Sequence, residues 1–136
     1  MPDGVVLCLN GKTITMQNPA DMTDDVDVIK VSGQFTLTDC KTGDAQGKIT
    51  HATNASNNKY EGKGVKVLGG TFHMFGGIIT GNTSAYDTGG SGVCVDSHKT
   101  NGSEFKLYGG KITGNTAKNG GGVEVSRYTN EQSAVF

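Results

Sequence analysis

Short apolar stretches alternate with polar residues along the whole chain, and no segment shows a sustained helical period. Alternation over three to five residues predicts short β-strands with one face toward a core and the other toward solvent. Three such stretches carry valine at every second position: 65–67, 93–95 and 123–125. The side chains between these valines, which we expect to face outward, are Lys66, Cys94 and Glu124.

These stretches belong to a longer repeat. Residues 105–115 (FKLYGGKITGN) repeat residues 72–82 (FHMFGGIITGN) at an offset of 33 positions, with seven of eleven residues identical. Weaker copies lie upstream, so that about four copies of three short strands fit the chain. Their approximate spans are 5–31, 35–67, 71–95 and 104–125.

A repeat of this length predicts coils that stack in parallel, like on like, so that each coil shares a thin apolar core with its neighbours. We therefore expect one all-β domain over residues 1–136, a parallel β-helix (solenoid) of about four coils with essentially no α-helix. Asn82 and Asn115 fall at equivalent corners, where stacked Asn side chains can hydrogen-bond in a ladder. An antiparallel sandwich also has many short strands, but it predicts hairpins and no fixed long repeat.

The composition agrees with a repeat architecture. The chain has 22 glycines, about twice the usual share of about 7%, only 2 prolines, and 34% apolar residues. Collagen is excluded because glycine does not recur at every third position. The net charge of −1 does not indicate a nucleic-acid partner, and no apolar run is long enough to span a membrane as a helix.

The stretches TFHMFGGIITGN, FKLYGGKITGN, GGGVEV and LCLNGKTIT resemble the Gly-rich right-handed parallel β-helix repeats of bacterial surface proteins. These are adhesin-like or pectate-lyase-like solenoids of the kind found in gut Firmicutes. The resemblance spans about residues 5–125. It implies a right-handed, single-stranded β-helix in an extracellular or cell-surface setting. It does not imply an active site, because the repeats of that family are mostly scaffold.

The two ends of the chain suggest a fragment of a longer solenoid. No secretory signal precedes the first repeat, although the resemblance implies export. At the other end, Val135 falls where Phe105 lies one repeat earlier, so the chain stops at the first strand of a further coil. Open solenoid ends expose strand edges and core positions. We therefore expect self-association through the ends.

Two outward aromatic residues are candidates for ligand binding. In the predicted register Phe75 and Tyr108 lie one coil apart, beside His73 and Lys106. Exposed aromatic rings can stack on sugar rings, and adjacent polar groups can bind hydroxyls. The alternative is an aromatic ladder that only stabilises the sheet.

Four carboxylates are the weak catalytic candidates: Asp87, Asp96, Glu104 and Glu124. Two carboxylates at a defined separation can hydrolyse a glycosidic bond, but the alternative is that all four are solvated charges. A separate acidic loop matches no calcium-binding spacing: Asp21, Asp24, Asp25 and Asp27. A row of outward threonines is expected on one face: Thr15, Thr50, Thr80 and Thr113. Such rows occur in ice-binding solenoids and in ordinary strands alike.

The histidines and cysteines match no zinc-binding spacing, so we expect neither a metal nor a cofactor. The histidines lie at non-equivalent positions: His51, His73 and His98. With Phe35 stacked on Leu7, the neighbour of Cys8 is not a cysteine. No bridge from Cys8 to Cys40 is then expected, and Cys94 in its outward row is expected to be exposed.

Three functions remain open. The first is a structural or adhesive module that contacts glycans or a host protein. The second is a polysaccharide hydrolase or lyase, which requires an acidic group converging on one face. The third is a metal- or ice-binding solenoid. The sequence favours the adhesive module, because it needs only exposed aromatic residues and polar loops.

Overall fold

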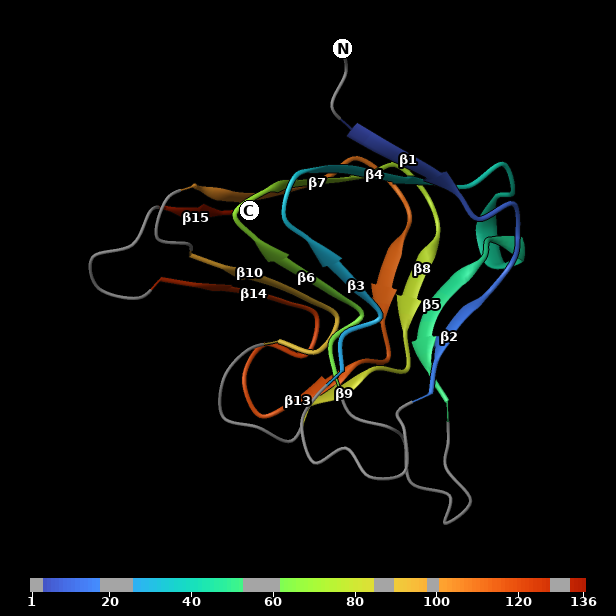
Figure 1. Ribbon diagram of the computed structural model, residues 1–136. Coiled ribbons are helices and arrows are strands. Elements are labelled where there is room, and N and C mark those ends of the chain that lie inside the picture. The colour runs from blue at the N-terminus through green and yellow to red at the C-terminus, as the bar shows by residue number, and fades with distance from the viewer. Residues whose placement is uncertain (1–3, 18–25, 53–61, 85–89, 98–100, 128–132) are drawn as a thin grey trace.

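The computed structural model describes residues 4–17, 26–52, 62–84, 90–97, 101–127 and 133–136. Within these ranges the chain forms fifteen short β-strands and one 3-10 helix, η1 (Gly43–Ala45). Three parallel sheets form the sides of a solenoid, and the chain passes from one sheet to the next in every coil (Figure 1).

Each sheet collects one strand from every coil. Sheet A consists of β1 (Gly4–Cys8), β4 (Gln34–Thr38), β7 (Thr71–Met74), β11 (Ser103–Leu107) and β15 (Ala134–Val135). Sheet B consists of β2 (Ile14–Met16), β5 (Lys48–His51), β8 (Ile78–Thr80) and β12 (Lys111–Thr113). Sheet C consists of β3 (Ile29–Val31), β6 (Val65–Leu68), β10 (Val93–Asp96) and β14 (Val123–Ser126).

The predicted parallel solenoid is confirmed. Every strand pairing in the described part of the chain is parallel, which is incompatible with an antiparallel sandwich. In Figure 1 the chain turns clockwise as it recedes from the viewer, which makes the solenoid right-handed. Sheets B and C each stack four strands, which are separated by three full turns, and sheet A adds the short fifth strand β15, so the number of turns differs slightly from the four coils predicted. A small sheet of β9 (Thr83–Ser84) and β13 (Thr116–Ala117) was not predicted.

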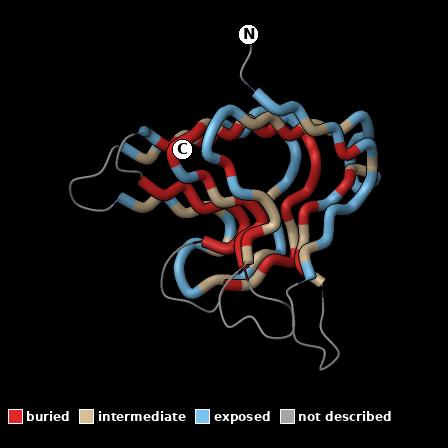
Figure 2. The backbone as a smooth tube through the Cα atoms, in the orientation of Figure 1, coloured by how far each residue is buried: buried red, intermediate tan, exposed pale blue. Residues whose placement is uncertain are grey.

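The core consists of columns of like side chains. In one column Phe35, Phe72, Phe105 and Phe136 stack with ring centroids 5.6, 4.9 and 5.0 Å apart. In sheet C the predicted valines of β6 and β10 are fully buried. Figure 2 shows that buried positions concentrate in the middle coils, because those coils are covered on both sides.

A ladder of hydrogen bonds connects the corners where the chain leaves sheet B. The equivalent positions of Asn82 and Asn115 in the repeat predicted it. Asn82 Nδ2 donates to Asn115 Oδ1 at 2.9 Å and to the Ile49 carbonyl at 3.3 Å. Asn115 Nδ2 donates in turn to the Ile79 carbonyl at 2.9 Å. The ladder ends at His51, whose Nδ1 lies 2.8 Å from Asn82 Oδ1. This buried row satisfies polar groups that would otherwise destabilise the corner.

Two residues at the C-terminal side of the stack face inward as predicted, but the expected burial of their side chains is wrong. Leu107 and Val125 follow the core alternation, yet they are 43% and 44% exposed. The reason is that β15 pairs only with Ser103 and Glu104, and β14 is the last strand of sheet C. The predicted register of the last strand is also wrong by one position. Val135 pairs with Glu104, and it is the next residue, Phe136, that stacks on Phe105.

Candidate functional site

The outer face of sheet A carries two rows of side chains that run along the solenoid axis. Because the strands pair in register, residues two positions apart on each strand form neighbouring rows. The first row is Val6, Thr36, His73 and Lys106. The second row begins with Cys8 and Thr38 and continues into the residues that directly follow β7 and β11, Phe75 and Tyr108.

The structure places the four candidate ligand-binding residues together on this face. The rings of Phe75 and Tyr108 stack with centroids 4.5 Å apart and planes inclined by 11°. The two residues are 52% and 60% exposed. His73 meets Phe75 and Tyr108 edge-on, with centroids at 6.5 and 5.9 Å. We call Phe75, Tyr108, His73 and Lys106 the aromatic face.

Two polar groups lie beside the rings. His73 Nε2 is buried and has no hydrogen-bond partner in the structure. Lys106 Nζ forms an ion pair with Glu104 Oε2 at 3.1 Å, and both side chains are substantially exposed. An exposed ion pair of this kind contributes little to stability but presents both charges to a ligand. The aromatic face therefore combines exposed ring surface with donors and acceptors.

A second polar cluster covers the outer face of sheet C. Lys66, Cys94 and Glu124 are cross-strand neighbours there. Lys66 Nζ lies 3.0 Å from Asp96 Oδ2. Burial favours the neutral amine of Lys66, but the contact with Asp96 outweighs it and holds the pKa of Lys66 above its usual value. Ser126 Oγ donates to Glu124 Oε1 at 3.0 Å.

The expectation that Cys94 is exposed is wrong, because its side chain is fully buried. The small thiol stands between the long side chains of Lys66 and Glu124, and its Sγ donates to Asp96 Oδ1 at 3.3 Å. Burial raises the pKa of Cys94 to about 12, and the adjacent Asp96 carboxylate adds to the rise. A thiol in this setting is a poor nucleophile, since only the thiolate attacks.

The three candidate carboxylates that the structure describes do not converge on one face of the solenoid. Glu104 lies on sheet A, paired with Lys106, whereas Asp96 and Glu124 lie on sheet C. On sheet C the Asp96 carboxylate forms an ion pair with Lys66, and Asp96 is buried. Asp87 lies outside the described residues.

The remaining candidates form no further site among the residues that the structure describes. Asp27 is buried and accepts a hydrogen bond from the Lys63 backbone N–H at 3.2 Å, while the rest of the acidic loop, Asp21, Asp24 and Asp25, lies outside the described residues. The threonine row of sheet B is formed, with Thr15 beside Thr50 and Thr80 beside Thr113. His98 is not described. In the described part of the chain no three His, Cys, Asp or Glu side chains gather as metal ligands.

The predicted separation of Cys8 and Cys40 is wrong. β1 and β4 pair with Leu7 beside Leu37, not beside Phe35, so that Cys8 falls next to Thr38. The chain then bends back, and the Sγ atoms of Cys8 and Cys40 lie 2.9 Å apart. Aligning Leu7 with Leu37 gives the observed register, but it places Cys8 beside Thr38, so the contact with Cys40 follows from the bend after β4 and not from the alignment. Nothing in the sequence pointed to Asp39, whose carboxylate accepts backbone hydrogen bonds at this corner.

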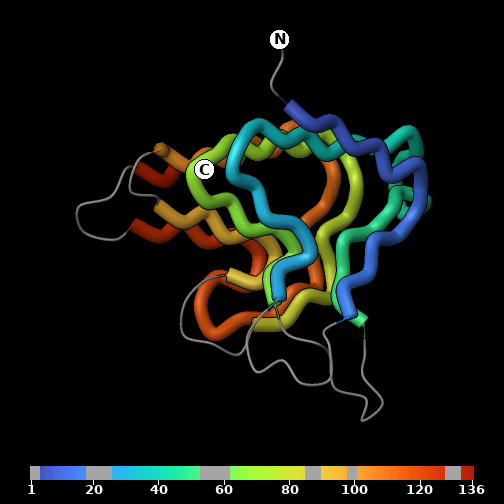
Figure 3. Tube along the Cα trace, in the orientation of Figure 1, coloured from blue at the N-terminus to red at the C-terminus, as the bar shows by residue number. Residues whose placement is uncertain are grey.

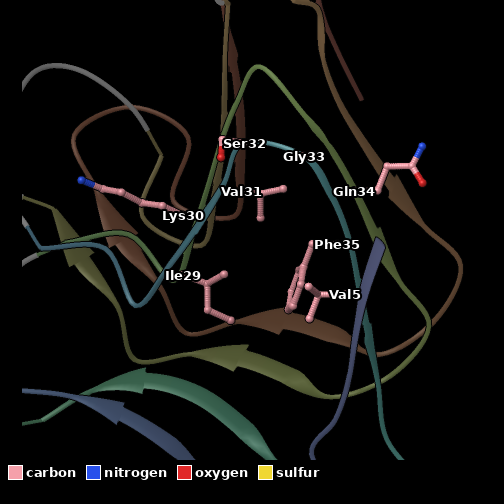
Figure 4. Close-up of a pocket in the computed structure, with 8 residues that line it drawn as sticks. All are labelled: Val5, Ile29, Lys30, Val31, Ser32, Gly33, Gln34 and Phe35. Carbon is pink, nitrogen blue, oxygen red and sulfur yellow. The ribbon is translucent and has the colours of Figure 1, made fainter. Parts of the chain in front are cut away.

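A hollow of about 360 Å³ opens at the N-terminal end of the solenoid. Figure 4 shows Val5, Ile29, Val31 and Phe35 around it, at the ends of β1, β3 and β4. Most of these side chains belong to core columns, so the hollow is the open end of the core and not a separate pocket. Lys30, Ser32 and Gln34 also line it, but it contains none of the candidate catalytic carboxylates.

None of the helical structure in the described residues is long and apolar enough to cross a membrane. Comparison with family models, with curated proteins and with solved structures finds no match to this chain. Functional inference therefore depends on the residues and the geometry above.

Proposed function

We propose that this chain is a structural and adhesive β-helix module of a bacterial surface protein, which contacts glycans through the aromatic face. The observation that carries the proposal is the exposed, stacked pair of Phe75 and Tyr108. Isolated exposed hydrophobic residues are ordinary, but two adjacent aromatic rings flanked by polar side chains form a specific contact surface. The bacterial and cell-surface setting is supported by the repeat resemblance alone.

Tyr108 is the residue best placed to contact a sugar ring. Phe75 covers one face of its ring, and because β15 pairs only with Ser103 and Glu104, the end of β11 has no described neighbouring strand on the side away from β7. A sugar ring stacked on the free face of Tyr108 would extend the aromatic row by one member. Phe75 would act by holding the Tyr108 ring in place, His73 would support both rings edge-on, and Lys106 would bind hydroxyl groups.

The alternative, a polysaccharide hydrolase or lyase, finds less support in this geometry. Hydrolysis by two carboxylates needs both groups to face one substrate bond. Glu104 is on a different sheet from Asp96 and Glu124, and Asp96 is buried against Lys66. In the polar cluster of sheet C, Asp96 is engaged by Lys66 and Cys94. Glu124 Oε1 accepts a hydrogen bond from Ser126, while Glu124 Oε2 is buried with no hydrogen-bond partner in the structure.

The test is a glycan-array screen followed by titration calorimetry on any glycan that binds, beside a reducing-sugar assay on pectin, xylan and mucin. We expect binding without turnover. Tyr108→Ala should weaken the affinity about tenfold or more, the usual loss at an aromatic contact residue, and Phe75→Ala should weaken it less. Phe136→Ala is the matched control, because Phe136 is an equally exposed, stacked aromatic residue on the core column.

Results of two kinds, in binding and in turnover, would contradict the proposal. The first is the absence of binding to any glycan, or equal loss of binding in the Tyr108→Ala and Phe136→Ala variants. The second is turnover of a polysaccharide that disappears in Asp96→Ala or Glu124→Ala, which would establish the enzyme instead.

A further inference from the structure

The corner that joins sheets A and B brings two cysteines from different coils together. Cys8 ends β1, and Cys40 follows β4 by two residues, 32 positions later in the sequence. Their Sγ atoms lie 2.9 Å apart and share a hydrogen bond, and both residues are exposed. Figure 3 shows the first two coils running side by side through this corner.

The corner is held rigidly by Asp39. Its carboxylate accepts hydrogen bonds from three backbone N–H groups, those of Gly11 at 3.1 Å, Lys41 at 2.8 Å and Gly47 at 2.6 Å. Burial opposes the charge, but these donors outweigh it and hold the pKa of Asp39 below its usual value. Asp39 thus ties the turn of the first coil to that of the second, so the position of Cys40 against Cys8 does not depend on the thiols themselves.

We propose that Cys8 and Cys40 form a reversible intramolecular disulfide that fastens the first coil to the second. Two exposed thiols held within bonding reach by an ordered corner are the arrangement that closes to a disulfide in preference to reacting with separate partners. The bond would close a loop of more than thirty residues and anchor β1, the edge strand of sheet A. The oxidant is a small-molecule disulfide such as glutathione disulfide.

The exchange proceeds in two balanced steps. The Cys8 thiolate attacks one sulfur of glutathione disulfide, which forms a mixed disulfide and expels one glutathione thiolate that takes up the Cys8 proton. The Cys40 thiolate then attacks Cys8 Sγ, breaks the mixed disulfide and releases the second glutathione, which takes up the Cys40 proton. Two cysteine thiols are oxidised and one glutathione disulfide is reduced to two glutathione molecules.

The order of attack follows from the contact between the thiols. The hydrogen bond from Cys40 lowers the pKa of Cys8, and the same contact raises the pKa of Cys40. Cys8 therefore carries more thiolate and attacks first. Cys94, buried and with its pKa raised, takes no part and serves as an internal reference.

The experiment compares the reduced protein with protein incubated in glutathione disulfide, by intact mass, peptide mapping and calorimetry. The oxidised chain should lose the mass of two hydrogen atoms, contain one Cys8–Cys40 linked peptide and keep Cys94 as a thiol. Its Tm should rise by about 5–10 °C, as expected for a loop of this size. Cys94→Ala, which keeps the pair, should behave in the same way.

The single variants separate the pair from ordinary surface thiols. Cys8→Ser and Cys40→Ser should each accumulate one glutathione adduct on the remaining exposed cysteine and show no rise in Tm. The proposal is overturned if the unaltered chain retains two glutathione adducts, if it forms a disulfide between two chains, or if Cys94 is oxidised. A linked pair with an unchanged or lower Tm would overturn the fastening role.

Discussion

At the scale of single residues, Asn82 is the most connected polar group of the corner ladder. Its side chain is fully buried and contacts three groups, on Ile49, His51 and Asn115. Its backbone N–H also donates to Asn115 Oδ1 at 3.1 Å. A buried polar group costs stability when it loses its partner, so the ladder stabilises the corner only while each member is present.

Replacing Asn82 with alanine should therefore destabilise the fold. Asn82→Ala leaves the Ile49 carbonyl and His51 Nδ1 without their contact, and it creates a small cavity beside them. We expect a loss of about 2–4 kcal/mol in the free energy of unfolding, measured by urea denaturation. Asn101→Ala, at an exposed position, should change it by no more than about 0.5 kcal/mol. Equal effects in the two variants would show that the ladder does not stabilise the fold.

Residue type and repeat position together made part of this ladder predictable. Asn82 and Asn115 occupy the same place in near-identical repeats, so their stacking follows from the offset alone. The role of His51 could not be found in this way, because it stands two residues after its buried isoleucine and the asparagines stand three after theirs. Burial of Cys94 was also missed, since alternation gives the direction of a side chain and not how far its neighbours cover it.

At the scale of elements, glycine precedes three of the four strands of sheet C, whereas Val28 precedes β3. Gly64, Gly92 and Gly122 occupy equivalent positions before β6, β10 and β14. A Cβ on Gly92 would lie 2.3 Å from the Gly122 carbonyl oxygen of the next coil. On Gly122 a Cβ would meet nothing within 4 Å. At Gly92 it is therefore the close approach of the next coil, and not an unusual backbone angle, that excludes a side chain.

This contrast gives a matched pair of substitutions. Gly92→Ala should lower the free energy of unfolding by about 1–3 kcal/mol, because the coils must separate to admit the methyl group. Gly122→Ala should be neutral or raise it by up to about 1 kcal/mol, through a less flexible unfolded chain. Chemical denaturation of both variants measures the difference. A Gly122→Ala variant as unstable as Gly92→Ala would show that the close approach is not what selects glycine.

The strands themselves were the most predictable elements. Period-two alternation and the repeat located the strands of all three sheets, since each strand needs only a few residues that alternate. The pair β9 and β13 was not predicted, because two residues are too few to show a period. The outward direction of Phe75 and Tyr108 was also predictable, but their stacking distance depended on the register between coils, which only the structure provides.

At the scale of the whole molecule, the solenoid has an apolar surface at each end of its core. The N-terminal end is the hollow around Val5, Ile29 and Phe35, where Val5 is 65% exposed. The other end presents Leu107, Val125 and Phe136. The end strands also have one backbone edge without a partner among the described residues. Each end therefore exposes the kind of surface that one coil buries against the next inside the solenoid. The two ends can pack on each other because the same columns of core side chains run from one end to the other.

We expect copies of this chain to associate end to end through these surfaces. Light scattering coupled to size-exclusion chromatography should show a dimer or larger species whose share grows with protein concentration. Val125→Lys places a charge at the C-terminal end of the core, where a neighbouring copy would have to bury it, so it should shift the chain toward monomer. Thr113→Lys, outward and exposed on the same coil, should not. A strict monomer at all concentrations, or equal effects of the two lysines, would exclude association through the core ends and leave these surfaces to another partner.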